Sequence, residues 1–138
     1  MKVSLVPAML MDNCWDQIEG YLEKACKYTY GRYTPEDIKE MIEDESFQLW
    51  IAFDKKIYGV VVTQFMAYPR SKFLSLSFCG GVNISKWLDP MMELLKRFAG
   101  DMGCDGLEAT GRAGWAKLLK KHGHESRWVT FELPIEGV

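Results

Sequence analysis

The sequence is poor in residues that bind metal ions. It contains four cysteines and two histidines in 138 residues, and no two cysteines form a CxxC pair. The histidines, His122 and His124, are far in sequence from the cysteines, so the ligand spacing of a zinc site is missing and we expect no metal. Reduced, mostly buried thiols in a cytosolic protein explain the cysteines better. They are Cys14, Cys26, Cys79 and Cys104.

Long apolar runs and strong charge are also missing. No stretch approaches the roughly 20 apolar residues that cross a bilayer, and no N-terminal run resembles a signal peptide. The net charge is −2, whereas broad nucleic-acid binding needs a basic face. We therefore expect a cytoplasmic protein that engages neither membrane nor nucleic acid.

What is present describes an ordinary folded domain. A chain of 138 residues with 48% hydrophobic and 26% charged residues can bury a substantial core without disulfides or metals. The sequence shows no repeat, no low-complexity segment and no linker. We therefore expect a single domain that covers residues 1–138.

The spacing of apolar residues predicts alternating strands and helices. Thr34 and Pro35 mark a helix start, with a hydroxyl cap followed by proline at the first helical position. The predicted elements are a strand in 2–8, a helix from Asp12 to Cys26, a short helix from Pro35, strands Phe47–Phe53, Ile57–Tyr68 and Phe73–Phe78, a helix over Trp87–Phe98, a strand Gly106–Thr110, a helix Trp115–His122 and a strand Arg127–Ile135. This order predicts an α/β fold with a mixed, mostly antiparallel sheet flanked by helices.

Two starting points remain open for the helix over Trp87–Phe98. Pro90 disfavours helical angles at Asp89, so the helix begins either with Asp89 as its cap and Pro90 first, or near Asn83 or Ser85 with Pro90 one turn inside. The choice matters because an aspartate cap would satisfy the helix amides and repel a phosphate.

The order of strands and helices, together with three stretches of sequence, resembles the GNAT acyltransferase superfamily over nearly the whole chain. The resemblance rests on "LWIAFDKKIYGVVVTQFMAYPRSKFLSLSF", "DPMMELLKRFAGDMGCDGLEATG" and "GWAKLLKKHGHESRWVTFEL". It implies an acyl-CoA N-acyltransferase fold. Within the superfamily the chain is most similar to small, diverged members encoded by phages and prophages.

In active members of that superfamily, the turn after the fourth strand holds the coenzyme A pyrophosphate through a Q/R-x-x-G-x-G/A pattern. Here the turn has adjacent glycines but no second small residue at that spacing, and Val82 and Ile84 bring bulk. It is therefore either a degenerate phosphate site or only a structural corner. The resemblance assigns coenzyme binding to Phe78, Cys79, Gly80, Gly81, Asn83, Ser85 and Lys86.

The usual catalytic groups of the family are not at their expected positions. The strand "FLSLSF" has no glutamate to act as a base. Leu119 occupies the position at which many members carry a tyrosine that acts as the general acid. Tyr68, Glu108 and His122 are the candidates that could compensate. Each has an ordinary alternative, namely a turn anchor for Tyr68, a solvated strand-edge residue for Glu108 and a surface residue on the last helical turn for His122. Cys79 is more simply a buried thiol than a nucleophile.

Two functions from different classes follow from this resemblance. One is an enzyme that transfers an acetyl group from acetyl-CoA to an amine of a small molecule or protein. The other is a catalytically inactive GNAT-fold phage protein, in the host cytoplasm or the virion, that acts in virion structure or assembly through a protein partner. A homodimer formed through an exposed edge strand is a third possibility. The tyrosines Tyr28, Tyr30 and Tyr33 border either the acceptor or a protein interface.

Overall fold

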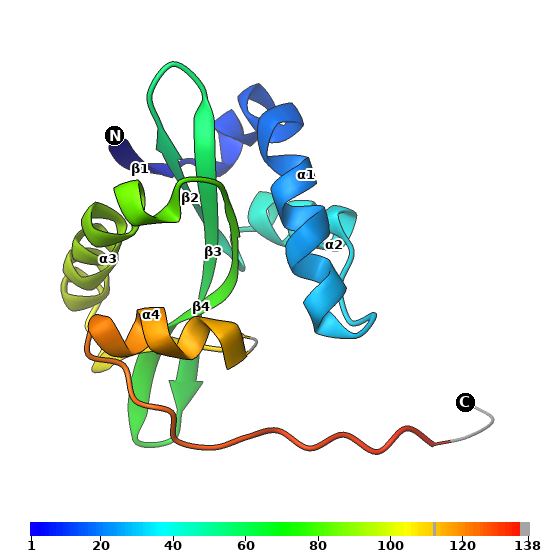
Figure 1. Cartoon of the computed structure of the whole chain (residues 1–138), viewed down its shortest axis with the longest axis vertical. Helices are drawn as coiled ribbons and strands as arrows, with labels where there is room; N and C mark the ends of the chain where they lie inside the picture. The colour runs from blue at the N-terminus through cyan, green and yellow to red at the C-terminus, as the bar shows by residue number, and fades with distance from the viewer. Residues whose placement is uncertain (112, 136–138) are drawn as a thin grey trace.

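The computed structural model describes residues 1–111 and 113–135 (Figure 1). A five-stranded sheet forms its centre, and helices cover both faces. The strands are β1 Lys2–Val6, β2 Gln48–Phe53, β3 Ile57–Tyr68, β4 Ser71–Gly81 and β5 Gly106–Ala109. The helices are α1 Trp15–Cys26, α2 Pro35–Glu43, α3 Ile84–Asp101 and α4 Ala116–Lys121, with 3₁₀-helices at Ala8–Asn13, Lys27–Thr29 and Ala113–Trp115.

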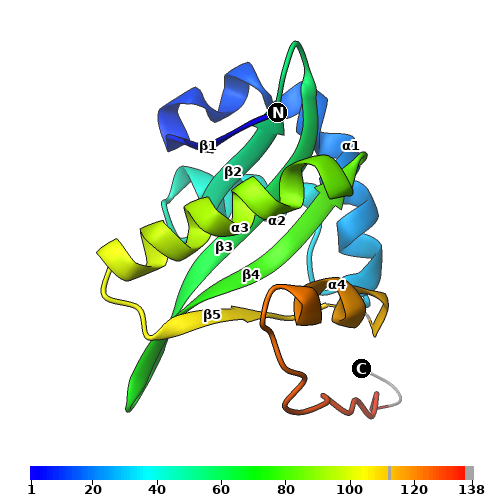
Figure 2. The same cartoon turned by 60° about the vertical axis from the view of Figure 1, so that its left-hand side comes forward.

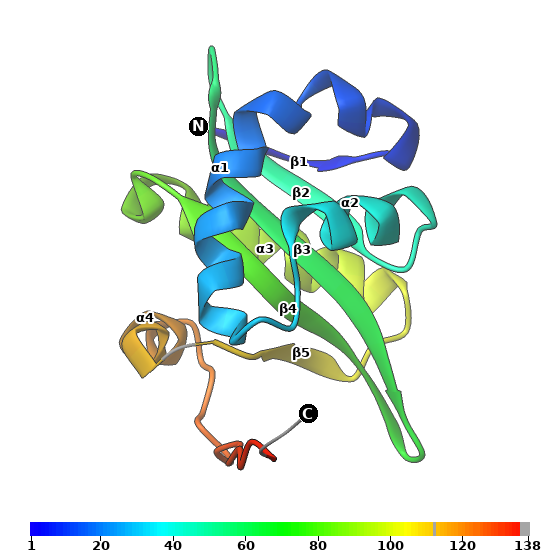
Figure 3. The same ribbon diagram turned by 90° about the vertical axis from the view of Figure 1, so that its right-hand side faces the viewer.

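The strands lie in the order in which they occur in the chain, from β1 to β5. Neighbouring strands are antiparallel except β4 and β5, which are parallel because α3 carries the chain back across the sheet. Figures 2 and 3 show α3 on one face of the sheet and α1 and α2 on the other. The predicted fold class, a mixed and mostly antiparallel sheet flanked by helices, is therefore confirmed.

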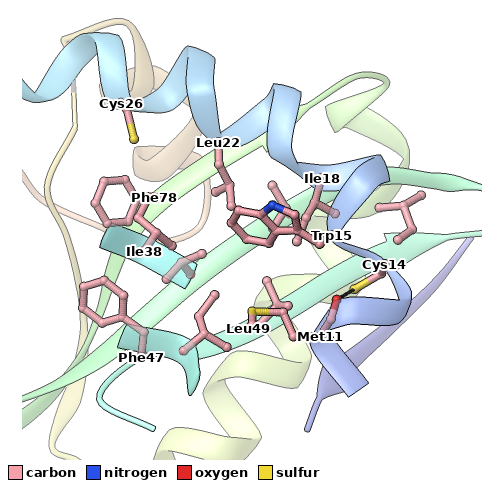
Figure 4. Close-up of a cluster of buried hydrophobic side chains, with 14 residues drawn as sticks. Met11, Cys14, Trp15, Ile18, Leu22, Cys26, Ile38, Phe47, Leu49 and Phe78 are labelled. Atoms are coloured by element: carbon pink, nitrogen blue, oxygen red, sulfur yellow. Dashed lines mark hydrogen bonds between the residues drawn. The ribbon is translucent and has the colours of Figure 1, made fainter. Parts of the chain in front are cut away.

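Two hydrophobic cores hold these layers together. The first joins α1 and α2 to their face of the sheet, and Figure 4 shows Ile18 and Leu22 of α1 pointing toward Leu49 and Phe78. The second lies under α3, where Trp87 and Leu95 are fully buried against the other face. Each sheet face is apolar in its centre, so burial on both sides fixes the register of the strands.

The start of α2 follows the local sequence closely. The Thr34 hydroxyl accepts a hydrogen bond from the Asp37 backbone N–H at 3.2 Å, and the Asp37 carboxylate accepts one from the Thr34 N–H at 2.9 Å. Pro35 occupies the first helical position, where no N–H is needed. This reciprocal capping confirms the predicted helix start.

The predicted last strand is wrong. Residues 127–135 form an extended segment that pairs with no strand in the described part of the chain. Their residue types suit a strand, but strand propensity supplies no partner, and a strand needs neighbours to bury its side chains. The helix before it is also shorter than predicted, since α4 covers only Ala116–Lys121.

Among the described residues, the longest helix, α3, is too polar to cross a bilayer, and the shorter helices do not qualify either.

Candidate functional site

An opening in the sheet lies beside the second half of β4. Strand β4 pairs with β3 along its whole length up to Gly81, but with β5 only from Phe73 to Leu76. The last contact on the β5 side is the Thr110 N–H, which lies 3.4 Å from the Leu76 carbonyl oxygen. Beyond that point β4 and β5 diverge, so the side of residues 77–81 that faces away from β3 has no strand beside it within the described residues.

A β-bulge at Ser77 changes the direction of β4 where the opening begins. Val62 pairs with Phe78 and Thr63 with Leu76, so Ser77 is the additional residue. The bulge reverses the alternation of side chains. Leu76 lies in the core under α3, whereas Phe78 lies in the core under α1. The Gln64 side-chain amide donates to the Ser77 hydroxyl at 3.0 Å and holds the bulge in place.

The bulge leaves two peptide groups directed into the opening. The Val82 N–H donates to the Tyr58 carbonyl at 2.8 Å, which makes these residues a hydrogen-bonded pair between β3 and the end of β4. Peptide groups alternate in direction along an antiparallel strand, so those of Gly81 and Cys79 point away from β3. They are the main-chain donors and acceptors available to a ligand at this edge.

The glycine pair has a structural explanation of its own. A side chain at Gly80 would come within 2.8 Å of the Tyr21 carbonyl oxygen of α1. A side chain at Gly81 would overlap the Tyr58 carbonyl oxygen, and its φ of +136° disfavours any residue other than glycine. Packing of the protein against itself therefore requires both glycines, whether or not a ligand binds there.

Helix α3 begins at Ile84, so the alternative in which Asp89 caps the helix is wrong. Pro90 lies inside the helix, and Asn83 occupies the cap position with left-handed angles of φ 55° and ψ 38°. The Asn83 side chain makes no capping hydrogen bond, and the first turn holds no acidic residue. The first amides of α3, including those of Ile84 and Ser85, therefore have no intrahelical acceptor and carry the positive end of the helix dipole.

The residues around this helix start fit a phosphate-bearing ligand. Asn83, Ser85 and Lys86 are exposed beside the first amides of α3. Trp87 does not obstruct the opening, because it is fully buried over Gly59 in the core under α3, where its indole N–H donates to the Val82 carbonyl at 2.8 Å. The Val82 amide itself is already used by Tyr58 and is unavailable to a ligand.

Two of the predicted catalytic candidates meet at the sheet edge. The Tyr68 hydroxyl contacts both carboxylate oxygens of Glu108, at 2.8 and 3.0 Å. This hydrogen bond to Glu108 is the main cause that raises the pKa of Tyr68, so the phenol stays protonated and donates to the carboxylate. Glu108 pairs with Ser75, one residue before the pairing of β4 and β5 ends, so the carboxylate lies close to the opening.

The third candidate, His122, has a different environment. It follows α4, and its Nε2 atom lies 3.1 Å from a carboxylate oxygen of Asp89 on α3. The contact connects α4 to α3, as a structural residue would. Its neighbour His124 is also packed inward, and burial is the main cause that lowers the pKa of His124.

The Cys79 side chain is partly buried. It packs against the core under α3, and burial raises the pKa of its thiol to about 12. Such a thiol is protonated near neutral pH and is a poor nucleophile. The interpretation of Cys79 as a buried thiol therefore fits the structure, and its contribution to the opening is its main chain.

Sequence reasoning missed a row of polar side chains that crosses neighbouring strands on the α1 and α2 side of the sheet, called here the polar row. Gln64 pairs with Ser75 across the two strands, and Gln64 also holds Ser77. Glu108 continues the row on β5. Polar residues at alternate positions of a long apolar strand were the available signal, but the bulge that brings Ser77 into the row cannot be read from alternation.

The tyrosine-containing loop has both buried and exposed members. The ring of Tyr33 packs edge-on against Phe78, with 5.1 Å between ring centroids, whereas Tyr30 is 81% exposed. Two hollows of the described surface have no lining residue in 77–86. One lies beside β1 and includes Leu5 and Leu10, and the other lies between α4 and the following segment and includes Lys117 and Lys120.

Solved protein structures share the architecture of this chain. No protein-family model matches the sequence, and no curated protein resembles it significantly in sequence. A solved structure of a probable acetyltransferase has a TM-score of 0.74 and 12% identity, and the match covers 100% of both chains. The ribosomal-protein-alanine N-acetyltransferase of Brucella melitensis biovar Abortus 2308 has a TM-score of 0.72 and 11% identity, covering 98% of this chain and 100% of the other.

A third similar structure is an aminoglycoside acetyltransferase from an uncultured soil metagenomic sample, solved with sisomicin. Its TM-score is 0.69 at 11% identity, and the match covers 98% of this chain and 96% of the other. Likeness at this identity shows a shared fold and no more. This chain therefore has the GNAT-like fold of these acetyltransferases.

Proposed function

We propose that this protein belongs to the GNAT superfamily and transfers an acetyl group from acetyl-CoA to an amine. The observation that carries the proposal is the open edge of β4 beyond Leu76, directly next to the uncapped start of α3. Exposed main-chain groups and a helix N-terminus together bind a ligand that has both amide and phosphate groups. The shared fold of the acetyltransferase structures supports the same activity.

The main chain would hold most of the coenzyme. The peptide groups of Cys79 and Gly81 face the opening and can pair with an extended amide chain, as an added strand would. The amides of Ile84 and Ser85, with the Lys86 ammonium, would face the pyrophosphate. Phe78, Gly80 and Asn83 shape this edge. When bound, acetyl-CoA supplies an acetyl group activated as a thioester.

Glu108 would serve as the general base. Its carboxylate would take up, directly or through one water, the proton that the amine loses as its nitrogen bonds to the acetyl carbon and the carbon–sulfur bond breaks. The Tyr68 hydroxyl donates to that carboxylate and fixes its position. Because Leu119 cannot donate a proton, water would protonate the departing thiolate. Positioning of the amine against the thioester would provide most of the acceleration.

Thermal melting with acetyl-CoA tests whether the coenzyme binds. Binding to the native state alone should add about 2.7 kcal/mol of stability at a hundredfold excess over the dissociation constant. No change in Tm at millimolar acetyl-CoA would overturn the proposal. Gly81 is a poor site for a control variant, since its substitution would collide with Tyr58.

Ser85→Asp is a sharper variant because its two effects have opposite signs. Ser85 is exposed in the first turn of α3, so an aspartate there should stabilise the free protein through the helix dipole while repelling a phosphate. We expect a higher Tm without ligand and no ligand-induced rise. Asn13→Asp makes the same charge change at an exposed position outside α3 and should keep the full rise.

Glu108→Gln tests the catalytic role separately from binding. The variant should retain the acetyl-CoA-induced rise in Tm and lose acetyl transfer by about 10²–10⁴-fold, measured as thiol release with a panel of amines. An unchanged rate would remove Glu108 from the mechanism. Tyr68→Phe should cost less, since it removes only the donor that positions the carboxylate.

A second function, a catalytically inactive protein of phage structure or assembly, is favoured by a different observation. Internal packing alone explains both glycines of the turn, and Leu119 offers no proton. Such a protein would act through a protein partner, in the host cytoplasm or the virion. It predicts no acetyl-CoA effect on Tm, together with a defined partner that co-purifies from the native source.

A further inference from the structure

The segment 127–135 is unusually apolar for a part of the chain that nothing covers. Phe131 is 91% exposed and Leu133 is 88% exposed. Trp128, Val129 and Ile135 are each more than two-thirds exposed as well. Scattered exposed apolar residues are ordinary, but five large ones within residues 128–135 mark an interaction surface.

The order of side chains in this segment is that of a strand with two different faces. In an extended chain, Val129, Phe131 and Leu133 point to one side, and Thr130 and Glu132 point to the other. One side is thus wholly apolar, and the other is mixed. This pattern suits an edge position in a sheet with a core on one face and a polar row on the other.

The body of the protein holds this segment weakly. The side-chain contact between the two within the described residues is an ion pair of Arg32 with Glu132 at 2.6 Å, and both side chains are about half exposed. Exposed pairs of this kind contribute little to stability. Figures 1 and 3 show the segment running past the edge of the sheet toward the side of α1, instead of lying along β5.

Strand β5 offers the complementary half of a strand pair. It is the last strand of the sheet, so one of its edges carries unpaired main-chain groups in the described part of the chain. Leu107 and Ala109 face the apolar core under α3, and Glu108 faces the polar row. The two faces of β5 therefore differ in the same way as the two sides of segment 127–135.

We propose that two copies of this chain exchange their segments, so that residues 127–135 of each copy add as a strand to β5 of the other. Each copy carries both an unpaired extended segment and an unpaired β5 edge. A two-fold arrangement therefore pairs both segments with both edges. The segment runs from its own β5 toward the side of α1, where Glu132 meets Arg32 (Figures 1 and 3). This inference does not depend on the proposed enzyme activity.

The test combines oligomeric state with hydrogen exchange on the full-length chain. We expect the wild type to be dimeric at high micromolar concentration by sedimentation velocity, and the double variant Val129→Asp/Phe131→Asp to be monomeric. Both side chains are exposed in the monomer, so the circular dichroism spectrum should not change. Met9→Asp introduces a charge at another apolar position, 87% exposed, and should remain dimeric.

Hydrogen exchange at Leu107 and Ala109 identifies where the segment docks. If the segment docks on a second copy, the β5 amides become more protected from hydrogen exchange as the protein concentration rises. The double variant then loses this protection. A monomer with β5 protected at every concentration would mean that the segment folds onto its own copy, which overturns the proposal. A dimer that survives the double variant, or a monomer with unprotected β5, would also overturn it.

Discussion

The region from β1 to β5 and the segment after α4 differ in how far their apolar side chains are buried. From β1 to β5 most large apolar residues are packed into two cores, and Leu95 is completely buried. After α4, Leu133 belongs to an equally apolar stretch and is 88% exposed. The difference lies in the partners and not in the residue types, because helices cover both faces of the first region, while the second is an extended segment that pairs with no strand among the described residues. Hydrophobic residues stabilise only what they are buried against.

The same substitution in both regions should show this difference most strongly. Leu95→Ala should lower the free energy of unfolding by about 2–5 kcal/mol, because it leaves a cavity under α3. Leu133→Ala should change it by less than about 0.5 kcal/mol in dilute solution, where the segment is uncovered. Urea denaturation measures both values. Equal losses in the two variants would show that the last segment is buried within its own copy.

Glycines provide the second comparison of the two regions. Gly81→Ala should cost about 1–3 kcal/mol, because the methyl group meets the Tyr58 carbonyl oxygen and φ is +136°. Gly114→Ala, just before α4, has open space around the new methyl group and should be nearly neutral. Denaturation curves of the two variants, compared with that of the wild type, measure the difference. A neutral Gly81→Ala would mean that the end of β4 is looser than its contacts with β3 indicate.

The sequence was sufficient to predict elements whose determinants are local. Thr34, Pro35 and Asp37 specify the start of α2 within four residues. The β-branched and aromatic residues of 57–68 predicted β3, and the alternation in 73–78 predicted part of β4. It also predicted the fold class, since a helix between β4 and β5 implies their parallel pairing.

The rest depended on contacts between distant residues. The reason for Gly81 is the carbonyl of Tyr58 on another strand, and the bulge at Ser77 is visible only in the register with β3. The start of α3 at Ile84 overrides the local preference of Pro90, because Trp87 and Leu88 are buried under the sheet and keep the first turn helical. For segment 127–135, the pattern specified a strand but could not specify what it pairs with.

The stability of the first region should fall at alkaline pH because of the Cys79 thiol. Burial raises the pKa of Cys79 from 9.0 to about 12, so the folded state holds its proton more tightly than the unfolded state. The resulting stability is complete below pH 9 and is lost as the pH rises from 9 toward 12. We expect Cys79→Ala to be less stable than the wild type at pH 8, but to lose less Tm between pH 8 and 10.5. An equal alkaline loss in both proteins would contradict the burial of this thiol.

The smallest expected effect lies at the β5 edge of the first region, where Tyr68 meets Glu108. The hydrogen bond to Glu108 raises the pKa of Tyr68, so this phenol should ionise at higher pH than an ordinary tyrosine. Glu108→Gln should return its titration, followed by NMR of the labelled ring, toward the ordinary value. Because Tyr68 is exposed, the shift should hardly change global stability. A titration that Glu108→Gln leaves unchanged would show that this pair does not persist in solution, and β5 would then present Glu108 free to its surroundings.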